Sequence, residues 1–182
     1  MAAHTGTSTL HGSTRRTARI GLIAAAGIAL FVLESLIPTP LPFLKIGLAN
    51  VSTVVALEMF GFSAGVLVMA IRVSVGSLLV GALLSPSFLV AAAAGLASSL
   101  IMGGVRAATG RLFSVVGLSL IGAIAHVIAQ LCVVSFLFVR SAALLSLLPL
   151  LLTTALIGGI VVGWVASAVL AGLRRVEGGL DA

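Results

Sequence analysis

The sequence of 182 residues contains few charged side chains: Asp, Glu, Lys and Arg together make up 8%, against roughly 25% in soluble domains. Hydrophobic residues make up 60%, and tyrosine is absent. A soluble domain of about 150 residues buries only about 68–70% of its chain surface, so it needs polar side chains to cover the remainder. The composition therefore excludes a soluble globular protein and indicates an integral membrane protein. Continuous apolar runs also exclude an outer-membrane barrel, whose strands alternate polar and apolar residues.

Acidic residues are especially scarce, since Glu34, Glu58, Glu177 and Asp181 are the four in the sequence. An enzyme that holds magnesium needs several carboxylates. Hydrolysis of ATP needs a Gly-Lys-Ser/Thr phosphate loop, which this sequence lacks. The single cysteine, Cys132, excludes an intrachain disulfide and a multi-cysteine metal site. We therefore expect a protein that is not an enzyme, with no catalytic residue, no metal and no cofactor.

Six apolar segments approach the length of about 20 residues that a helix needs to cross a bilayer. They predict an all-α fold, a polytopic membrane bundle of six transmembrane helices. Turn residues at Gly61 and at 85–87 divide the long apolar run from 46 to 105 into three crossings. We expect one domain over 15–175, a disordered tail over 1–14 and a second tail over 176–182. The expected helices are 17–36, 44–60, 63–84, 87–105, 113–138 and 148–172.

The basic residues orient this bundle. With six crossings, most of them fall on the side of the termini, and Lys45 and Arg140 fall on the opposite side. The larger set is Arg15, Arg16, Arg19, Arg106, Arg111, Arg174 and Arg175. By the positive-inside rule both termini should be cytoplasmic and the protein should lie in the bacterial inner (plasma) membrane. The net charge of +6 is then a topology signal rather than a nucleic-acid-binding surface.

Two alternatives to this topology are less consistent with the sequence. Five crossings would divide the basic clusters between the two faces of the membrane. The segment 13–16 resembles a twin-arginine signal, but five further apolar segments follow it, and the same arginines anchor the first helix.

Several polar residues lie within or beside the expected crossings, where a charge costs roughly 2.5–3.5 kcal/mol. Such residues usually face a cavity or a partner. We predict an outward-facing cavity that binds a small hydrophobic or anionic solute. Its expected ligand-binding residues are Glu34, Lys45, Asn50, Arg72, His126 and Gln130. The excess of positive groups on this side favours an anionic or electron-rich ligand over a cation.

Each of these residues also has a structural alternative. Arg72 would pair with Glu34 or Glu58 and hold two helices in register. His126 and Gln130 lie one turn apart on one helix face, where they would form an interhelical hydrogen-bond pair, a proton relay or a ligand clamp. Lys45 would snorkel to the membrane interface, as would Arg140. The sequence leaves these alternatives open.

The remaining expectations concern the segment 38–45 and the small residues of the first, fourth and sixth expected helices. Three alternating prolines make 38–45 stiff and extended, which suits a lid over the cavity or a cap over helix ends. Small residues spaced by four let helices approach closely. We expect those of the fourth and sixth helices, including Gly159, Gly163 and Ser167, to pack inside the bundle. Those of the first helix, Gly21, Ala25 and Ala29, suit either internal packing or docking of another protein.

The segments 34–38, 42–50 and 122–126, together with Gln130, resemble the Gx transporter family, which is also catalogued as heptaprenyl diphosphate synthase component I. The resemblance continues through Arg72, 76–79, Gly81 and 85–88, and so spans nearly all of 17–172. It departs from the family pattern after His126, where Val127 and Ile128 stand in place of an expected asparagine. The family in turn resembles the substrate-binding S components of energy-coupling factor transporters.

The resemblance implies six helices, cytoplasmic termini and a mobile loop at 38–45. It also implies that Gly21, Ala25 and Ala29 dock a membrane scaffold subunit. The chain would then be a substrate-binding subunit whose partners are that scaffold, separate ATPases, a small-molecule ligand and membrane lipid, and no nucleic acid.

The alternative function is a non-catalytic accessory component of isoprenoid or quinone metabolism, or of a membrane electron-transfer assembly. Its apolar groove would hold a prenyl chain, and Arg72 with His126 would hold the polar head. The one aspartate lies in the tail, so we do not expect the catalytic subunit of a prenyl synthase, which depends on aspartate-rich segments.

Overall fold

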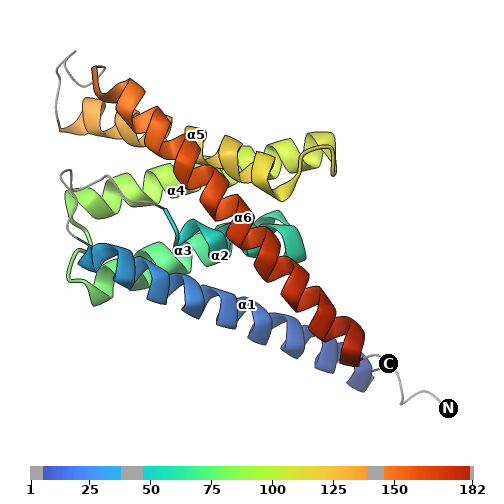
Figure 1. The fold of residues 1–182 in the computed structure, drawn as a ribbon. Helices are drawn as coiled ribbons and strands as arrows, with labels where there is room; N and C mark the ends of the chain where they lie inside the picture. Colours follow the sequence, from blue (N-terminus) through green and yellow to red (C-terminus); the bar gives the residue numbers. More distant parts are fainter. Residues whose placement is uncertain (1–5, 38–46, 139–145, 181–182) are drawn as a thin grey trace.

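The computed structural model describes residues 6–37, 47–138 and 146–180, and the regular structure within these ranges is entirely helical. The prediction of an all-α membrane helix bundle is confirmed (Figure 1). Five of the described helices are long and apolar enough to cross a membrane, and α2 is shorter. The helices are α1 (Gly6–Leu36), α2 (Asn50–Phe60), α3 (Phe62–Leu79), α4 (Pro86–Thr109), α5 (Val115–Leu137) and α6 (Leu148–Leu180).

The first and last helices extend beyond their expected bounds. α1 begins at Gly6, so residues 6–14 are helical where we expected a disordered tail. α6 continues to Leu180 and takes up most of the expected tail at 176–182. Neither extension contains proline, the strongest helix breaker. The arginines that adjoin the two extensions are good helix formers.

Helix α2 differs most from the expected crossing at 44–60. It contains 11 residues, which at 1.5 Å per residue is about 16 Å, roughly half of the hydrocarbon thickness. Every residue from Val51 to Leu57 is buried, and α2 packs against α1, α3 and α6. Its first residue, Asn50, is hydrogen-bonded to Arg72 in the middle of α3. The apolar segment therefore forms a buried half-length helix that begins in the interior of the bundle.

Local sequence signals explain where the other helices begin. Gly61 joins α2 to α3 with φ of 91°, a left-handed conformation that favours glycine. Ser85 caps α4 by accepting a hydrogen bond from the Phe88 backbone N–H, and Pro86 occupies the first helical position. Ser114 caps α5 in the same way, with the Gly117 N–H as donor. The turns at Gly61 and at 85–87 are the ones that the sequence indicated, whereas the Ser114 cap was not predicted.

The start of α1 and the end of α6 lie at the same end of the bundle, which we call the terminal end (Figure 1). The opposite end is the far end. The turns between α2 and α3 and between α4 and α5 also lie at the terminal end, so the seven arginines of the larger basic set gather there. Lys45 and Arg140 fall outside the described residues.

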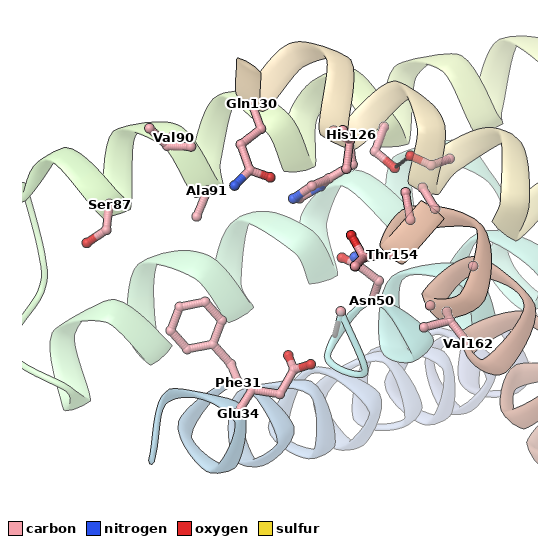
Figure 2. A pocket seen from close by; sticks show the side chains of 18 of the residues that line it. Phe31, Glu34, Asn50, Ser87, Val90, Ala91, His126, Gln130, Thr154 and Val162 are labelled. Atoms are coloured by element: carbon pink, nitrogen blue, oxygen red, sulfur yellow. Dashed lines mark hydrogen bonds between the residues drawn. The ribbon is translucent and has the colours of Figure 1, made fainter. Parts of the chain in front are cut away.

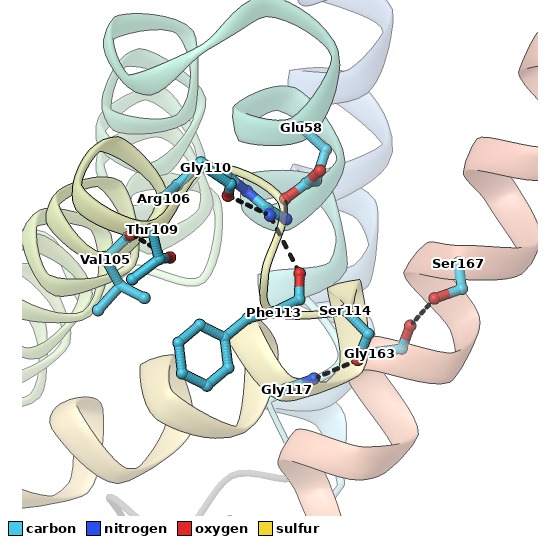
Figure 3. A network of polar contacts seen from close by, with 10 residues as sticks. All are labelled: Glu58, Val105, Arg106, Thr109, Gly110, Phe113, Ser114, Gly117, Gly163 and Ser167. Carbon is cyan, nitrogen blue, oxygen red and sulfur yellow. Dashed lines mark hydrogen bonds and ion pairs between the residues drawn. The ribbon is translucent and has the colours of Figure 1, made fainter.

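A polar network at the terminal end fastens the last turn of α2 to its neighbours (Figure 3). Glu58 of α2 forms an ion pair with Arg106 of α4. The Arg106 guanidinium also donates to the carbonyls of Gly110, at 2.9 Å, and Phe113, at 3.0 Å, in the turn before α5. On the other side, Arg16 of α1 donates to the Phe60 carbonyl at 3.1 Å. Glu58 therefore has a structural partner, far from the Arg72 side chain that we considered for it.

Most small residues of α4 and α6 pack inside the bundle, as expected, but Gly104 and Ala171 are exposed. A Cβ atom added to Gly163 would lie 2.6 Å from the Cα atom of Val116 on α5. Ser98 of α4 donates a 2.8 Å hydrogen bond to the Gly122 carbonyl of α5. The small residues of α1 differ, because nothing lies within 4 Å of a Cβ added to Gly21, and Ala25 and Ala29 are exposed. This face of α1 is left uncovered by the described chain.

Candidate functional site

A cavity of about 470 Å³ lies between the helices and receives residues from all six of them (Figure 2). It extends from Ile37 and Phe88 near the far end to Met102 and Val162 deeper in the bundle. Its size falls within the range of about 300–1,000 Å³ that is usual for sites of small ligands.

The cavity wall is largely apolar, with polar groups set into it. Glu34 is the sole Asp, Glu, Lys or Arg side chain among the described lining residues. The polar lining residues are Glu34, Ser35, Asn50, Ser77, Ser87, Ser98, Ser119, His126, Gln130 and Thr154. Phe31 and Phe88 supply aromatic surface. Such a wall suits a ligand that has an apolar body and a polar head.

The structure brings four of the six predicted ligand-binding residues to this cavity. Glu34 lies on α1, Asn50 at the start of α2, and His126 and Gln130 on α5. Asn50 lies between Glu34 on one side and His126 on the other (Figure 2). Lys45, the fifth, is outside the described residues. Arg72 is not among the lining residues and lies behind Asn50.

The Glu34 carboxylate caps the start of α2. Its Oε1 atom accepts the Leu48 N–H at 2.6 Å, and its Oε2 atom accepts the Ala49 N–H at 3.2 Å. The next N–H group, that of Asn50, bonds to the Gly47 carbonyl. A carboxylate at a helix N-terminus also interacts favourably with the helix dipole. Glu34 therefore ties the end of α1 to the half-length helix as well as lining the cavity.

Arg72 is 4% exposed, and its Nη2 atom donates a 2.9 Å hydrogen bond to Oδ1 of Asn50. Among the described residues it forms no ion pair with a carboxylate, and its Nε atom has no hydrogen-bond partner. No direct ion pair of Arg72 with Glu34 or Glu58 forms within the described chain, although Glu34 is close enough to act electrostatically on the Arg72 charge. Gly27 on α1 makes room for the arginine, because a Cβ atom there would lie 3.2 Å from Arg72 Cδ.

His126 faces the cavity with one buried ring nitrogen unsatisfied. Within the described ranges its Nδ1 atom has no hydrogen-bond partner, so it does not form the expected pair with Gln130 through that atom. The described residues contain no group of three His, Cys, Asp or Glu side chains that could hold a metal ion. A buried nitrogen without a hydrogen-bond partner is energetically costly.

Sequence reasoning missed several lining residues, among them Ser119, Thr154 and the two phenylalanines. Helical spacing offered a partial signal for one of them. Ser119 precedes His126 by seven residues and therefore lies on the same face of α5. Thr154 and Phe88 carried no comparable signal, because their place in the cavity depends on how α4 and α6 cross α5.

The match to known proteins falls on this same part of the chain. A model of the family described as heptaprenyl diphosphate synthase component I matches residues 23–169. The chain belongs to this family. The matched range contains every cavity residue from Phe31 to Val162. No curated protein and no solved structure gives a significant match.

In this heptaprenyl diphosphate synthase component I family member, the two carboxylates whose side chains the structure describes, those of Glu34 and Glu58, are engaged within the fold. Glu34 accepts two backbone N–H groups, and Glu58 is paired with Arg106. Because they lie on different parts of α1 and α2, they form no cluster of the kind that holds magnesium and diphosphate. Among the described lining residues of the cavity, Glu34 is the one carboxylate.

Proposed function

We propose that the chain is a membrane-embedded binding subunit that takes a small amphiphilic solute into the cavity between its helices. The observation that carries this proposal is the convergence of polar groups from α1, α2 and α5 on one apolar-walled space of about 470 Å³. Protein interiors are normally packed with few voids larger than a water molecule. A space of this size, lined by polar groups such as Asn50, His126 and Gln130, fits a protein that is completed by a ligand.

The proposed mode of action is that of an S component of an energy-coupling factor transporter. The sequence has no phosphate-binding loop, so separate ATPases and a membrane scaffold would supply the energy. The exposed face formed by Gly21, Ala25 and Ala29 is the proposed docking site for the scaffold. Close helix contact in a membrane needs such small residues, and none of the described chain covers this face.

The proposed orientation places the terminal end in the cytoplasm of a bacterium. Seven arginines at that end support this orientation by the positive-inside rule. The part of the cavity near Ile37 and Phe88 would then lie toward the outside, as uptake of a solute requires.

A second candidate follows from the family description, which names a synthase component. In that role the chain would be an accessory membrane subunit that holds a prenyl chain or a quinone. The apolar wall, including Phe31 and Phe88, would contact the chain. Asn50 and His126 would contact the polar head, because Arg72 does not line the cavity.

Purification from native membranes in mild detergent separates these candidates. Mass spectrometry would identify both bound small molecules and co-purified proteins. Recovery of a membrane scaffold and ATPases supports the transport role, whereas a prenyl synthase subunit or a flavoprotein supports the accessory role. Repeated recovery of neither a ligand nor a partner would contradict the proposed binding function.

A further inference from the structure

The hydrogen bond between Arg72 and Asn50 determines which polar group of Asn50 the cavity wall presents to a ligand. We infer, on the basis of the proposed function, that the cavity selects a ligand that presents a carbonyl or carboxylate oxygen. In this inference the Asn50 side-chain amide, through Nδ2, donates the hydrogen bond that recognises this oxygen.

Arg72 determines the orientation of the Asn50 side-chain amide. An arginine side chain has five N–H donors and no acceptor. The amide must therefore turn its oxygen toward Arg72, as the 2.9 Å contact between Nη2 and Oδ1 shows. Because Arg72 of α3 is buried and packs against Gly27 of α1, the opposite orientation of the amide would leave its N–H groups against a cation. The Asn50 nitrogen is thereby directed away from Arg72.

That nitrogen remains available within the described chain. Within the described residues Nδ2 of Asn50 makes no hydrogen bond, and it is not among the polar atoms sealed from solvent. Gly47, which also lines the cavity, lies beside it: a Cβ atom at Gly47 would be 3.3 Å from Nδ2. The neighbouring backbone donors at Leu48 and Ala49 are already bound to Glu34. Asn50 therefore supplies the unoccupied donor at this end of α2.

The charge of Arg72 acts on this donor through the Asn50 amide. The hydrogen bond from a cation to Oδ1 polarises the amide and strengthens its N–H groups as donors. A cationic ligand head would lie close to the buried Arg72 charge, which no carboxylate in the described chain pairs with directly. The Glu34 carboxylate lines the cavity and keeps its negative charge while it accepts from α2, so it offsets the Arg72 charge, and the choice of head group rests on the Asn50 donor. An oxygen acceptor is the head group that these surroundings favour.

Four probes with the same fused two-ring carbon skeleton and different polar groups test this selection. Menadione presents neutral carbonyls, naphthoate a carboxylate, naphthylmethylammonium a cation, and methylnaphthalene no polar head. Each is titrated against the purified chain in lipid nanodiscs, and the rise in thermal unfolding temperature gives its affinity. We expect menadione, naphthoate or both to bind about tenfold or more tightly than the ammonium and methyl probes. The comparison between menadione and naphthoate shows whether the preferred oxygen is neutral or charged.

The variant Asn50→Asp tests the residue itself. It keeps the side-chain size and an oxygen for Arg72, but it replaces the N–H donor with an acceptor. We expect the oxygen-headed probes to bind about tenfold or more weakly to this variant. Arg111→Gln is the matched control, because it changes the net charge by the same amount at an exposed residue in the turn before α5. If Asn50→Asp does not fold, the head-group series on the unaltered chain still tests the selection for an oxygen.

The possible results separate this inference from the proposed function. Equal or tighter binding of the ammonium or methyl probe would overturn the selection for an oxygen, while a ligand-binding role would stand. Unchanged affinity in folded Asn50→Asp would overturn the role of Asn50. If none of the four probes stabilises the unaltered chain, the inference and the proposed binding function would both be contradicted.

Discussion

Arg72 of α3 donates its hydrogen bond to Asn50 of α2 and forms no ion pair within the described chain. A buried arginine in a membrane protein is expensive, at roughly 2.5–3.5 kcal/mol on insertion scales. Here the cation supports the residue at which the half-length helix begins, directly behind the cavity. The relationship assigns Arg72 a positioning role: it orients Asn50 without lining the cavity itself.

Replacing Arg72 by Met tests this role. The substitution removes the buried cation and keeps a similar length beside Gly27. Asn50 loses one hydrogen bond, so we expect the free energy of unfolding to fall by about 1 kcal/mol at most, or to rise. Menadione or naphthoate affinity should fall, while Arg72→Lys, which keeps a cationic donor, should retain part of it. A loss of more than about 3 kcal/mol in Arg72→Met would indicate a buried ion pair instead.

The ion pair of Glu58 and Arg106 makes a separate prediction about stability. Both side chains are mostly buried, and Arg106 also holds the turn before α5. We expect Glu58→Gln to lower the free energy of unfolding by about 1–3 kcal/mol, measured by titration of mixed micelles with a denaturing detergent. A double-mutant cycle with Arg106→Gln should show coupling, and the exposed Arg111→Gln should change stability by less than about 0.5 kcal/mol. Additive effects in the cycle would contradict the pairing.

Glycine packing between α5 and α6 predicts a large effect from a single methyl group. A Cβ atom at Gly163 would lie 2.6 Å from the backbone of Val116, so one helix must move. We expect Gly163→Ala to destabilise the fold by about 1–3 kcal/mol. Gly104→Ala is the control on α4, where nothing lies within 4 Å, and it should be neutral or stabilising by up to about 1 kcal/mol. Equal effects of the two substitutions would show that helix propensity rather than packing decides.

The lengths of the apolar runs and the turn residues predicted the helix bundle well, but they did not predict the form of α2. Residues 44–60 are apolar enough for a crossing, and the sequence does not show that Glu34 caps a helix beginning only at Asn50. That arrangement depends on contact between residues 14 and 15 positions apart. The preference for anionic ligands rested on Lys45, Arg72 and Arg140. The structure places Arg72 behind the cavity wall, and the other two lie outside the described residues.

The uncovered face of α1 predicts the effect of bulky residues on assembly. Ala25→Leu or Ala29→Leu adds volume to an exposed helix face, so the fold of the chain itself should be preserved. We expect either substitution to abolish co-purification of a membrane scaffold and to leave menadione or naphthoate binding unchanged. Ala171→Leu, at an exposed residue of α6, should affect neither property. Loss of both properties in the α1 variants would indicate misfolding rather than a docking surface.

Native mass spectrometry of a variant with a filled cavity tests the central claim most directly. Ala91 on α4 points into the cavity (Figure 2), and Ala91→Phe would occupy part of its volume. Leu100→Phe is the control on the same helix, at a side chain that is 50% exposed outside the cavity. We predict that the unaltered chain and Leu100→Phe carry a bound small molecule that Ala91→Phe lacks, although all three are folded. Equal occupancy in Ala91→Phe, or no bound molecule in the unaltered chain, would contradict the assignment of this cavity as a ligand site.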